Sequence, residues 1–140
     1  MRFLQSLAIS SSALTAERLR LNLISNNLAN INTTRTAEGG PYRRKIAVFE
    51  ECLRTATNNT QTPGNGVKVT AIREDTSPLP LIYDPDHPDA DSQGFVALPN
   101  VNVVNEMVDL ITSTRTYEAN VNVFNACKSV VLKALDLGRA

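Results

Sequence analysis

The feature that most constrains the fold is an apolar repeat of seven residues near the start of the chain. Leucine recurs at this interval at Leu7, Leu14, Leu21 and Leu28. No Gly or Pro interrupts the segment from residue 3 to residue 31, so the spacing predicts one long helix with an apolar stripe along one side. The companion positions Ser11, Arg18 and Ser25 are polar. A stripe that is half leucine and half polar is typical of a coiled-coil seam that meets particular partners.

A second apolar repeat with the same interval lies near the end of the chain. Its members are Val103, Leu110, Tyr117, Phe124 and Val131, joined by Met107 and Val121. Asn102 is a suitable N-cap, because its side-chain oxygen can accept a hydrogen bond from a first-turn amide. Glu106 and Asp109 complement the positive end of the helix dipole, and Gly138 predicts the helix stop. At about 1.5 Å per residue, the two predicted helices measure roughly 45 and 55 Å.

The stretch between the two predicted helices has short alternating runs in place of helical periodicity. It contains all seven Pro and five of the six Gly of the chain. The β-prone runs, each of which predicts a strand, are residues 45–49, 67–72, 79–83 and 94–98. Residues 58–60 and 63–66 have strong turn chemistry, since Gly and Asn tolerate positive φ.

These patterns predict a mainly α chain with a small β-rich insert. Its parts would be an N-terminal helix in residues 1–32, the insert in residues 33–99 and a C-terminal helix in residues 100–140. Both helices are longer than such an insert is wide. If they pack antiparallel within one chain, their outer flanks stay exposed, so the terminal stripes are expected to need helices from other subunits.

Composition and charge exclude several classes of protein. The chain has 140 residues with 14 basic and 14 acidic side chains and no net charge, so no overall field attracts a nucleic acid or an anionic membrane. No apolar run reaches the roughly 18–20 residues that span a bilayer. Cys52 and Cys127 have neither metal-site spacing nor the density of a disulfide scaffold, and a bridge between them is left open.

The acidic cluster at residues 84–91 is the best candidate for a metal site. Its side chains, which offer oxygen donors suited to Ca²⁺, are Asp84, Asp86, His87, Asp89 and Asp91. The cluster lacks the Gly turn and terminal Glu of an EF-hand, and Pro85 and Pro88 stiffen it. A solvated loop is therefore the favoured interpretation, with no metal or other cofactor. Because the single histidine has no nucleophile motif beside it, we expect no catalysis.

Four short motifs near the two ends of the chain stand out. Residues 12–22 and 25–30 read SALTAERLRLN and SNNLAN, and residues 105–108 and 115–120 read NEMV and RTYEAN. The first pair resembles the N-terminal signature of the bacterial flagellar axial proteins, the family of rod, hook and hook-associated proteins. The second pair resembles the matching C-terminal signature of that family.

Motifs in the middle of the chain narrow this resemblance. GGPYRR at residues 39–44, DPDHPDA at residues 84–90 and PNV at residues 99–101 are similar to the proximal-rod C-type branch of the family. The resemblance covers nearly the whole chain, whose length leaves no room for the large outer domain of hook or distal-rod proteins. One departure is Cys127, where the family pattern has a small residue such as Ala.

The resemblance implies a structural, non-enzymatic subunit of the flagellar proximal rod, the drive shaft of the basal body. Such a subunit is exported by the flagellar type III apparatus into the periplasmic space. Its terminal helices then pack as coiled coils within a helical, tubular assembly. The implied partners are other flagellar rod proteins, copies of the chain itself, and basal-body ring and export-gate-adjacent components. No nucleic acid, small-molecule substrate or cofactor is implied.

The stripes and the resemblance together define an expected assembly interface, in which asparagines at the end of the first helix fix the register between subunits. Its residues on the first helix are Leu7, Leu14, Leu21, Asn26, Asn27, Leu28 and Asn30. Those on the second helix are Met107, Leu110, Tyr117, Asn120, Val121, Phe124 and Val131. The basic run at residues 43–45 leaves two interpretations open: contact with acidic groups of a neighbouring subunit, or solvated charges beside a strand. A soluble helical-hairpin adaptor or export chaperone is the alternative function, and a Ca²⁺-dependent module is a further rival.

Overall fold

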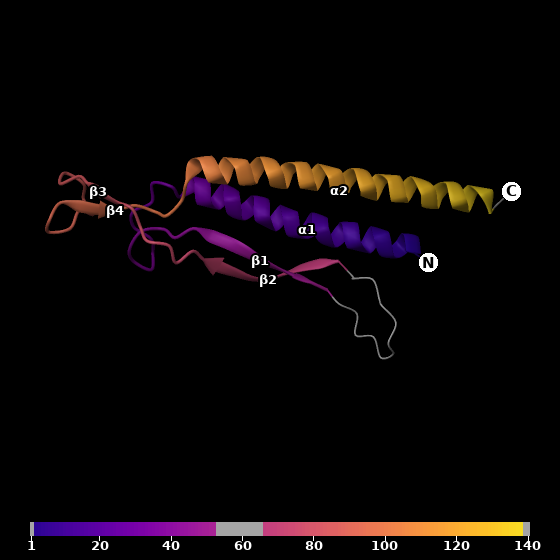
Figure 1. The fold of residues 1–140 in the computed structure, drawn as a ribbon, viewed down its shortest axis with the longest axis horizontal. Coiled ribbons are helices and arrows are strands. Elements are labelled where there is room, and N and C mark those ends of the chain that lie inside the picture. Colours follow the sequence, from indigo (N-terminus) through magenta and orange to yellow (C-terminus); the bar gives the residue numbers. More distant parts are fainter. Residues whose placement is uncertain (1, 53–65, 139–140) are drawn as a thin grey trace.

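The computed structural model describes residues 2–52 and 66–138 of the chain. Two long helices, α1 (Arg2–Ala29) and α2 (Val103–Leu137), lie side by side and run antiparallel, with both chain termini at the same end of an elongated molecule (Figure 1). Both helices that the heptad spacing predicts are thereby confirmed. Their 28 and 35 residues correspond to about 42 and 52 Å, so α2 projects beyond the first turn of α1.

Polar side chains fix the ends of both helices. The Asn102 side chain accepts hydrogen bonds from the backbone amides of Val104 and Asn105 at 3.0 and 3.2 Å, which confirms the predicted N-cap. The backbone amide of Gly138 donates to the carbonyl of Ala134 where α2 stops. At the end of α1, the Asn30 side-chain amide donates to the Asn26 carbonyl at 2.9 Å. These bonds satisfy groups that a helix leaves unpaired at its termini.

The insert forms two separate antiparallel pairs of strands. The first pair is β1 (Lys45–Glu51) with β2 (Val67–Glu74), and a bulge lies between Val48 and Phe49. The second pair is the β3–β4 hairpin, made of β3 (Leu81–Tyr83) and β4 (Phe95–Ala97). All four predicted strands are present, with shifted ends. The predicted turn at residues 58–60 and the first three residues of the predicted turn at 63–66 lie outside the described residues.

The two strand pairs differ in how they are held. The β1–β2 ribbon packs on α1, on the side away from α2 (Figure 1). Within the described ranges, the β3–β4 hairpin packs on no helix and on neither strand of the ribbon. It is anchored to the segment after α1, where the Thr34 hydroxyl donates to Asp89 at 2.8 Å and Arg35 lies 3.7 Å from the same carboxylate. The hairpin therefore stands out at one end of the molecule.

The core of the described chain is small and unusually polar. Its buried hydrophobic residues are Ala16, Ile24, Tyr42 and Val96, and its buried polar residues are Ser10, Asn27, Glu106 and Ser113. Because burial of apolar surface is the main stabilising term in folding, so short an apolar set gives the isolated chain little stability. Neither helix, within its described residues, has the length and apolar character needed to cross a membrane.

Candidate assembly interface

The centre of the structure is a polar junction that joins α1, α2 and the start of β1. Its residues are Arg20, Asn27, Tyr42, Arg44, Glu106 and Asp109. The Asn27 side chain, 1% exposed, donates to the Lys45 carbonyl at 3.0 Å and to Glu106 at 3.1 Å. Its oxygen accepts from the Lys45 amide at 2.9 Å and from the Tyr42 hydroxyl at 2.9 Å. One amide thus ties two helices and a strand together.

Charged groups complete the junction. The Arg44 guanidinium forms ion pairs with Glu106 and, at 3.1 Å, with Asp109. Arg20 on α1 lies 3.2 Å from the other oxygen of Asp109. Glu106 is fully buried, and a buried carboxylate needs a paired cation together with hydrogen bonds. Arg44, which immediately precedes β1, and Asn27 on α1 supply both, and their positions fix how α2 packs on them.

The junction shows where Arg44, in the basic run at residues 43–45, finds its partners. For this run the sequence leaves two interpretations open: contact with acidic groups of a neighbouring subunit, or solvated charges beside a strand. In the structure Arg44 is paired with two acidic residues of its own chain. Long-range pairing of this kind, 62 and 65 residues apart, leaves no trace in local spacing.

Among the described residues of the insert, Tyr42 and Asp75 have shifted pKa values. Burial raises the pKa of the Tyr42 hydroxyl, and the nearby negative charges of Glu106 and Glu74 raise it further. In the loop after β2, the hydroxyl and the backbone amide of Ser77 both donate to the Asp75 carboxylate and lower its pKa. Of these two pKa values, that of Tyr42 depends on the junction, because its hydroxyl lies within hydrogen-bond distance of the Asn27 and Asn26 side-chain oxygens.

The seam between the helices also holds polar atoms without partners. Glu17 Oε2 and Ser113 Oγ are buried, and the described residues provide no hydrogen bond for either atom. Both lie about one turn from the Arg20–Asp109 ion pair, at the same level of the antiparallel helices. An unsatisfied buried polar group costs about 1–3 kcal/mol, so the α1–α2 pair is weaker than an apolar seam of equal length.

The predicted interface residues occupy different environments. The half-buried positions along the two helices and directly after α1 are Leu7, Leu14, Leu21, Leu28, Asn30, Leu110, Tyr117, Asn120, Val121, Phe124 and Val131. Asn27 is buried, whereas Asn26 and Met107 are exposed. Asn26 and Asn30 bond to each other at 3.0 Å, and Asn27 has its partners within the chain. A role between subunits stays a prediction for all of these residues.

One face of α2 is exposed and apolar over about two turns of the helix. It consists of Val104, Met107, Val108 and Ile111, which we call the outer face of α2. These side chains are 53–68% exposed, and their spacing of three and four residues places them on one side of the helix. Contiguous exposed apolar surface marks sites of protein association.

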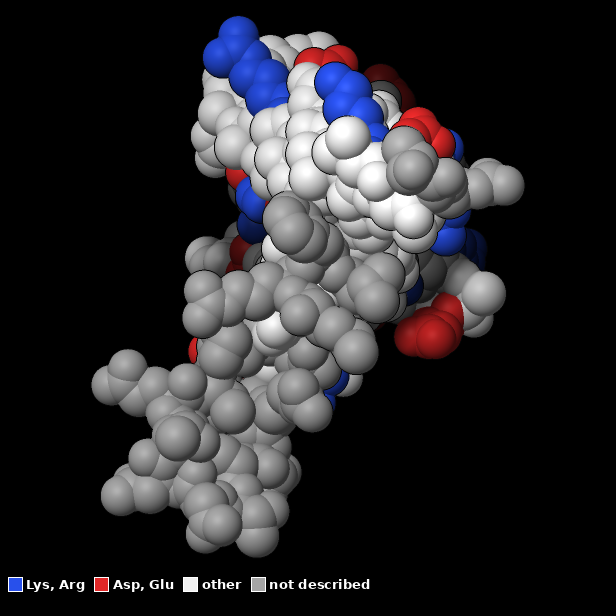
Figure 2. Space-filling view, turned by 90° about the vertical axis from the view of Figure 1, so that its right-hand side faces the viewer, with Lys and Arg blue, Asp and Glu red and all other residues white. Residues whose placement is uncertain are grey.

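The end of the molecule that carries the helix termini combines uncharged and charged surface. Figure 2 looks at this end and shows an uncharged area over the described atoms of its upper part, with Lys and Arg at the top and sides and Asp and Glu at the top and right. The last turns of α2 contribute exposed Val130, Leu132, Leu135 and Leu137. The C-terminal end of α2 and the outer face of α2 thus offer apolar surface to neighbours.

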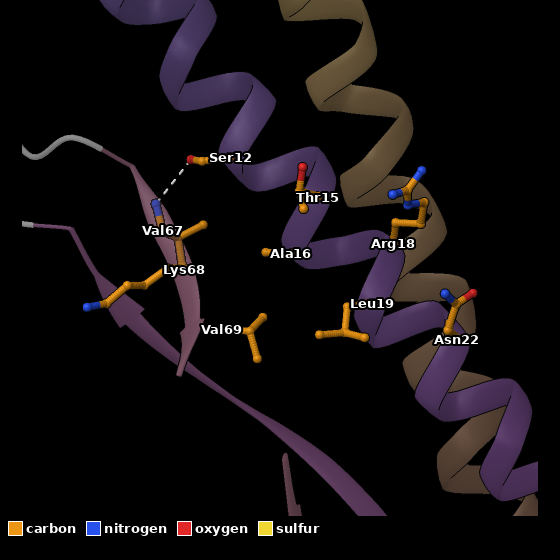
Figure 3. A pocket seen from close by; sticks show the side chains of 9 residues that line it. All are labelled: Ser12, Thr15, Ala16, Arg18, Leu19, Asn22, Val67, Lys68 and Val69. Atoms are coloured by element: carbon orange, nitrogen blue, oxygen red, sulfur yellow. Dashed lines mark hydrogen bonds between the residues drawn. The ribbon is translucent and has the colours of Figure 1, made fainter. Parts of the chain in front are cut away.

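A groove runs between α1 and the start of β2. We call it the α1–β2 groove; its volume is about 500 Å³ and its lining residues are Ser12, Thr15, Ala16, Arg18, Leu19, Asn22, Val67, Lys68 and Val69. Leu19 and Val69 face each other across it (Figure 3). The Val67 amide donates to the Ser12 hydroxyl at 3.1 Å.

The close approach of β2 to α1 depends on Gly66. Its φ is +99°, and a Cβ at this position would overlap the Ser12 hydroxyl. Glycine is the residue that adopts positive φ without strain. Gly66 therefore fixes where β2 begins and how wide the α1–β2 groove is.

The acidic cluster of the β3–β4 hairpin has structural partners. Asp89 bonds to Thr34 and Arg35, and Asp91 accepts the backbone amides of Gln93 and Phe95 at 2.8 and 2.9 Å. Across the described residues, no three His, Cys, Asp or Glu side chains are arranged to hold a metal ion. Cys52 and Cys127 are both free thiols.

Comparisons with known proteins agree with this arrangement of terminal helices around a small insert. Residues 7–35 match the family model described as flagella basal body rod protein, and residues 92–137 match the one described as flagellar basal body rod FlgEFG protein C-terminal. Flagellar basal-body rod protein FlgC of Bacillus subtilis (strain 168) is 47% identical over 145 residues, covering 96% of this chain and 97% of the relative. This chain belongs to the flagellar basal-body rod protein family.

Two further relatives have the same name. FlgC of Borreliella burgdorferi is 46% identical over 149 residues, covering 96% of this chain and 97% of the relative. FlgC of Escherichia coli O157:H7 is 43% identical over 139 residues, covering 99% and 100%. As a flagellar basal-body rod protein, the chain is a structural subunit of the rod rather than an enzyme. The resemblance noted in the sequence is confirmed.

Sequence reasoning missed the burial of Glu106 and Ser113 on α2. Glu106, Ser113, Asn120 and Cys127 recur at intervals of seven, and the first two are the least exposed residues of α2. Attention to apolar repeats alone passes over this polar row. A heptad search that includes small and polar side chains would have found it.

Proposed function

We propose that this rod protein assembles by packing the exposed faces of its two terminal helices against helices of neighbouring rod subunits, in coiled-coil fashion, within a helical tube. The observation that carries the proposal is the outer face of α2, which displays four large apolar side chains over two turns. Half-burial of Leu7, Leu14 and Leu21 supports it, because one partner helix covers only part of such a stripe. The partners would be other rod proteins and further copies of this chain.

Weak packing of the isolated chain also fits export in an unfolded state through the flagellar type III apparatus. The short apolar core and the two unpartnered polar atoms of the seam limit the free energy of unfolding. Burial against neighbours then supplies stability after export, at about 25 cal/mol per Å² of apolar surface. Placement beside the basal-body ring and the export gate belongs to the same proposal.

A cross-linking map of isolated basal bodies tests this assembly mode. A photoreactive residue at Val108 should capture helices of other rod subunits, whereas the same residue at Thr70, which is exposed on β2, should capture few. Absence of products from Val108 in intact basal bodies would exclude packing through the outer face of α2.

The alternative function, a soluble helical-hairpin adaptor or export chaperone, makes a different prediction for the purified chain. An adaptor should be monodisperse with protease-resistant helices, whereas a rod subunit awaiting partners should show low helicity by circular dichroism and early cleavage near both termini. A Ca²⁺-dependent module should instead give a calorimetric signal at millimolar Ca²⁺ that Asp86→Ala abolishes.

A further inference from the structure

The residues that flank the β1–β2 ribbon form an incomplete step of its ladder. Arg44 precedes β1 and Asp75 follows β2, and the Asp75 amide donates to the Arg44 carbonyl at 2.8 Å. In a regular antiparallel ladder, two residues paired in this way exchange both hydrogen bonds. Here the Arg44 amide donates instead to the side-chain oxygen of Asn100, also at 2.8 Å. The ribbon therefore ends on a side chain that belongs to the segment before α2.

The Asn100 side chain uses both ends of its amide at this point. Its Nδ2 donates to the carbonyls of Asp75 at 3.0 Å and Ser77 at 3.3 Å. The amide and the hydroxyl of Ser77 donate to the Asp75 carboxylate, and this turn brings the two carbonyls together. One N–H thus faces the oxygen of Asn100 and two carbonyls face its nitrogen, so a carboxylate, which only accepts, does not fit in its place.

Asn100 lies close to the start of α2 along the chain. The N-cap Asn102 follows two residues later, and the preceding Pro99 is buried and has a fixed φ. The start of α2 also lies at the same end of the molecule as the start of β1 and the end of β2 (Figure 1). An anchor at Asn100 is therefore passed on to the first turn of α2.

Arg44 is held at both its backbone and its side chain. Its amide is bonded to Asn100, and its guanidinium is paired with Glu106 and Asp109 on the first two turns of α2. Among the described residues, Asn100 and the Glu106 carboxylate share Arg44 alone, because the other partner of that carboxylate is Asn27. We propose that Asn100 is the positioning residue of the junction: it holds the Arg44 backbone so that the guanidinium points at Glu106 and Asp109, and it thereby sets the direction in which α2 leaves the insert.

The consequence for the rod rests on the proposed function. The outer face of α2 shares the first turns of the helix with Glu106 and Asp109, and Met107 and Val108 lie between these two residues in the sequence. Because a guanidinium holds these turns from one side, it fixes the direction in which the opposite side points. Asn100 thus acts on the contact surface without contacting a neighbouring subunit.

Amide hydrogen exchange of the unmodified chain gives the first test. The Arg44 amide has the Asn100 side chain as its acceptor, whereas the Arg43 amide has no acceptor among the described residues. After correction for intrinsic rates, the Arg44 amide should exchange at least tenfold more slowly than the Arg43 amide. Equal exchange would overturn the inference, because Asn100 would then not hold Arg44.

A double-mutant cycle tests whether Asn100 acts through Arg44. Glu106→Gln removes the charge that the guanidinium meets but keeps the shape of the side chain, so it should raise the equilibrium constant for unfolding in urea. In a chain that carries Asn100→Ala, the factor by which Glu106→Gln raises this constant should be at least threefold smaller, because the guanidinium no longer points at position 106.

The matched control for the cycle is Asn122→Ala. Asn122 is exposed on α2 and lies away from the junction, so the effects of Asn122→Ala and Glu106→Gln should multiply within twofold. Multiplying effects for Asn100→Ala as well would mean that Asn100 anchors the backbone alone, which overturns the inference. Where the Asn100→Ala chain does not fold, Asn100→Ser replaces it in the cycle, because its short hydroxyl does not reach Arg44 and Asp75 together.

Photo-cross-linking in isolated basal bodies tests the consequence for the rod. With a photoreactive residue at Val108, Asn100→Ala should lower the yield of products per incorporated chain at least fivefold, whereas Asn122→Ala should leave it unchanged. Equal yields would overturn the statement that Asn100 directs the outer face of α2. Absence of products from the otherwise unmodified chain would contradict the proposed function, while slow exchange of the Arg44 amide and a cycle that does not multiply would still support the positioning role of Asn100.

Discussion

Asn27 on α1 donates a hydrogen bond to Glu106 on α2, with 3.1 Å between Nδ2 and Oε2, although the two residues are 79 positions apart in the chain. Asn27 is 1% exposed and Glu106 is fully buried. A polar pair at one fixed point of a helix seam specifies register, because a shift by one turn leaves both groups buried without partners. The antiparallel alignment of the terminal helices is therefore set at this point.

Substitution Asn27→Ala should lower the free energy of unfolding by about 2–4 kcal/mol, since each buried donor or acceptor left without a partner costs about 1–3 kcal/mol. The Lys45 amide and the Glu106 carboxylate would lose their partner on α1. Urea denaturation followed by circular dichroism measures the change, and hydrogen exchange of the Lys45 amide should accelerate. Asn22→Ala is the matched control, because Asn22 is exposed on the same helix and lies outside the junction; an equal loss in both variants would contradict the junction's role.

Stability should fall at alkaline pH through Tyr42. Burial raises its pKa in the folded chain, so the unfolded chain loses the proton first, near the ordinary value of about 10. The contribution is fully present below that pH and is lost as the pH rises toward the folded pKa, with a slope of at most about 1.4 kcal/mol per pH unit. Unfolding free energies from pH 9 upward measure the slope.

Tyr42→Phe should flatten this alkaline slope while lowering stability at pH 7, because the Asn27 oxygen loses a hydrogen bond. Tyr83→Phe serves as the control, since Tyr83 is exposed on the β3–β4 hairpin. A slope that survives in Tyr42→Phe, or that disappears in Tyr83→Phe, would show that another group titrates.

The sequence predicted both helices and all four strands because each has a local signature. Heptad spacing marks α1 and α2, Asn102 and Gly138 mark the ends of α2, and alternation marks the strands. Local signatures do not show which residues far apart in the sequence contact each other in the folded chain. The buried residues of α2 are Glu106 and Ser113, and a search for apolar stripes does not place them in the helix seam.

The candidate interface was predictable to a similar extent. Its half-buried leucines and aromatic residues follow from the repeats, whereas the environment of Asn27 does not. Its partners come from Tyr42, Lys45 and Glu106, and only tertiary structure brings these together. The α1–β2 groove was missed for the same reason, because β2 reaches α1 through Gly66 and Ser12, which are far apart in the sequence.

Gly66→Ala should loosen the β1–β2 ribbon from α1. Alanine at this positive φ costs of order 1–3 kcal/mol, and its Cβ meets the Ser12 hydroxyl. Gly39→Ala isolates the backbone contribution, since Gly39 also has positive φ but has nothing within 4 Å of an added Cβ. Urea denaturation should show a larger loss for Gly66→Ala, and hydrogen exchange of the Val67 amide should accelerate only in that variant. Equal losses would mean that the Ser12 contact contributes nothing.

Charged residues on the outer face of α2 should block assembly without unfolding the chain. Met107→Lys with Ile111→Glu replaces two side chains that are more than half exposed, so the free energy of unfolding should change by less than about 0.5 kcal/mol, as is usual for surface substitutions. Desolvating these charges against a neighbouring helix is costly, so incorporation into basal bodies, measured by immunoblot of the isolated structures, should fall at least tenfold. Thr112→Lys with Thr114→Glu changes exposed positions of the same helix outside the apolar set and should retain incorporation. Normal incorporation of the Met107 and Ile111 double variant would rule out the outer face of α2 as a contact surface.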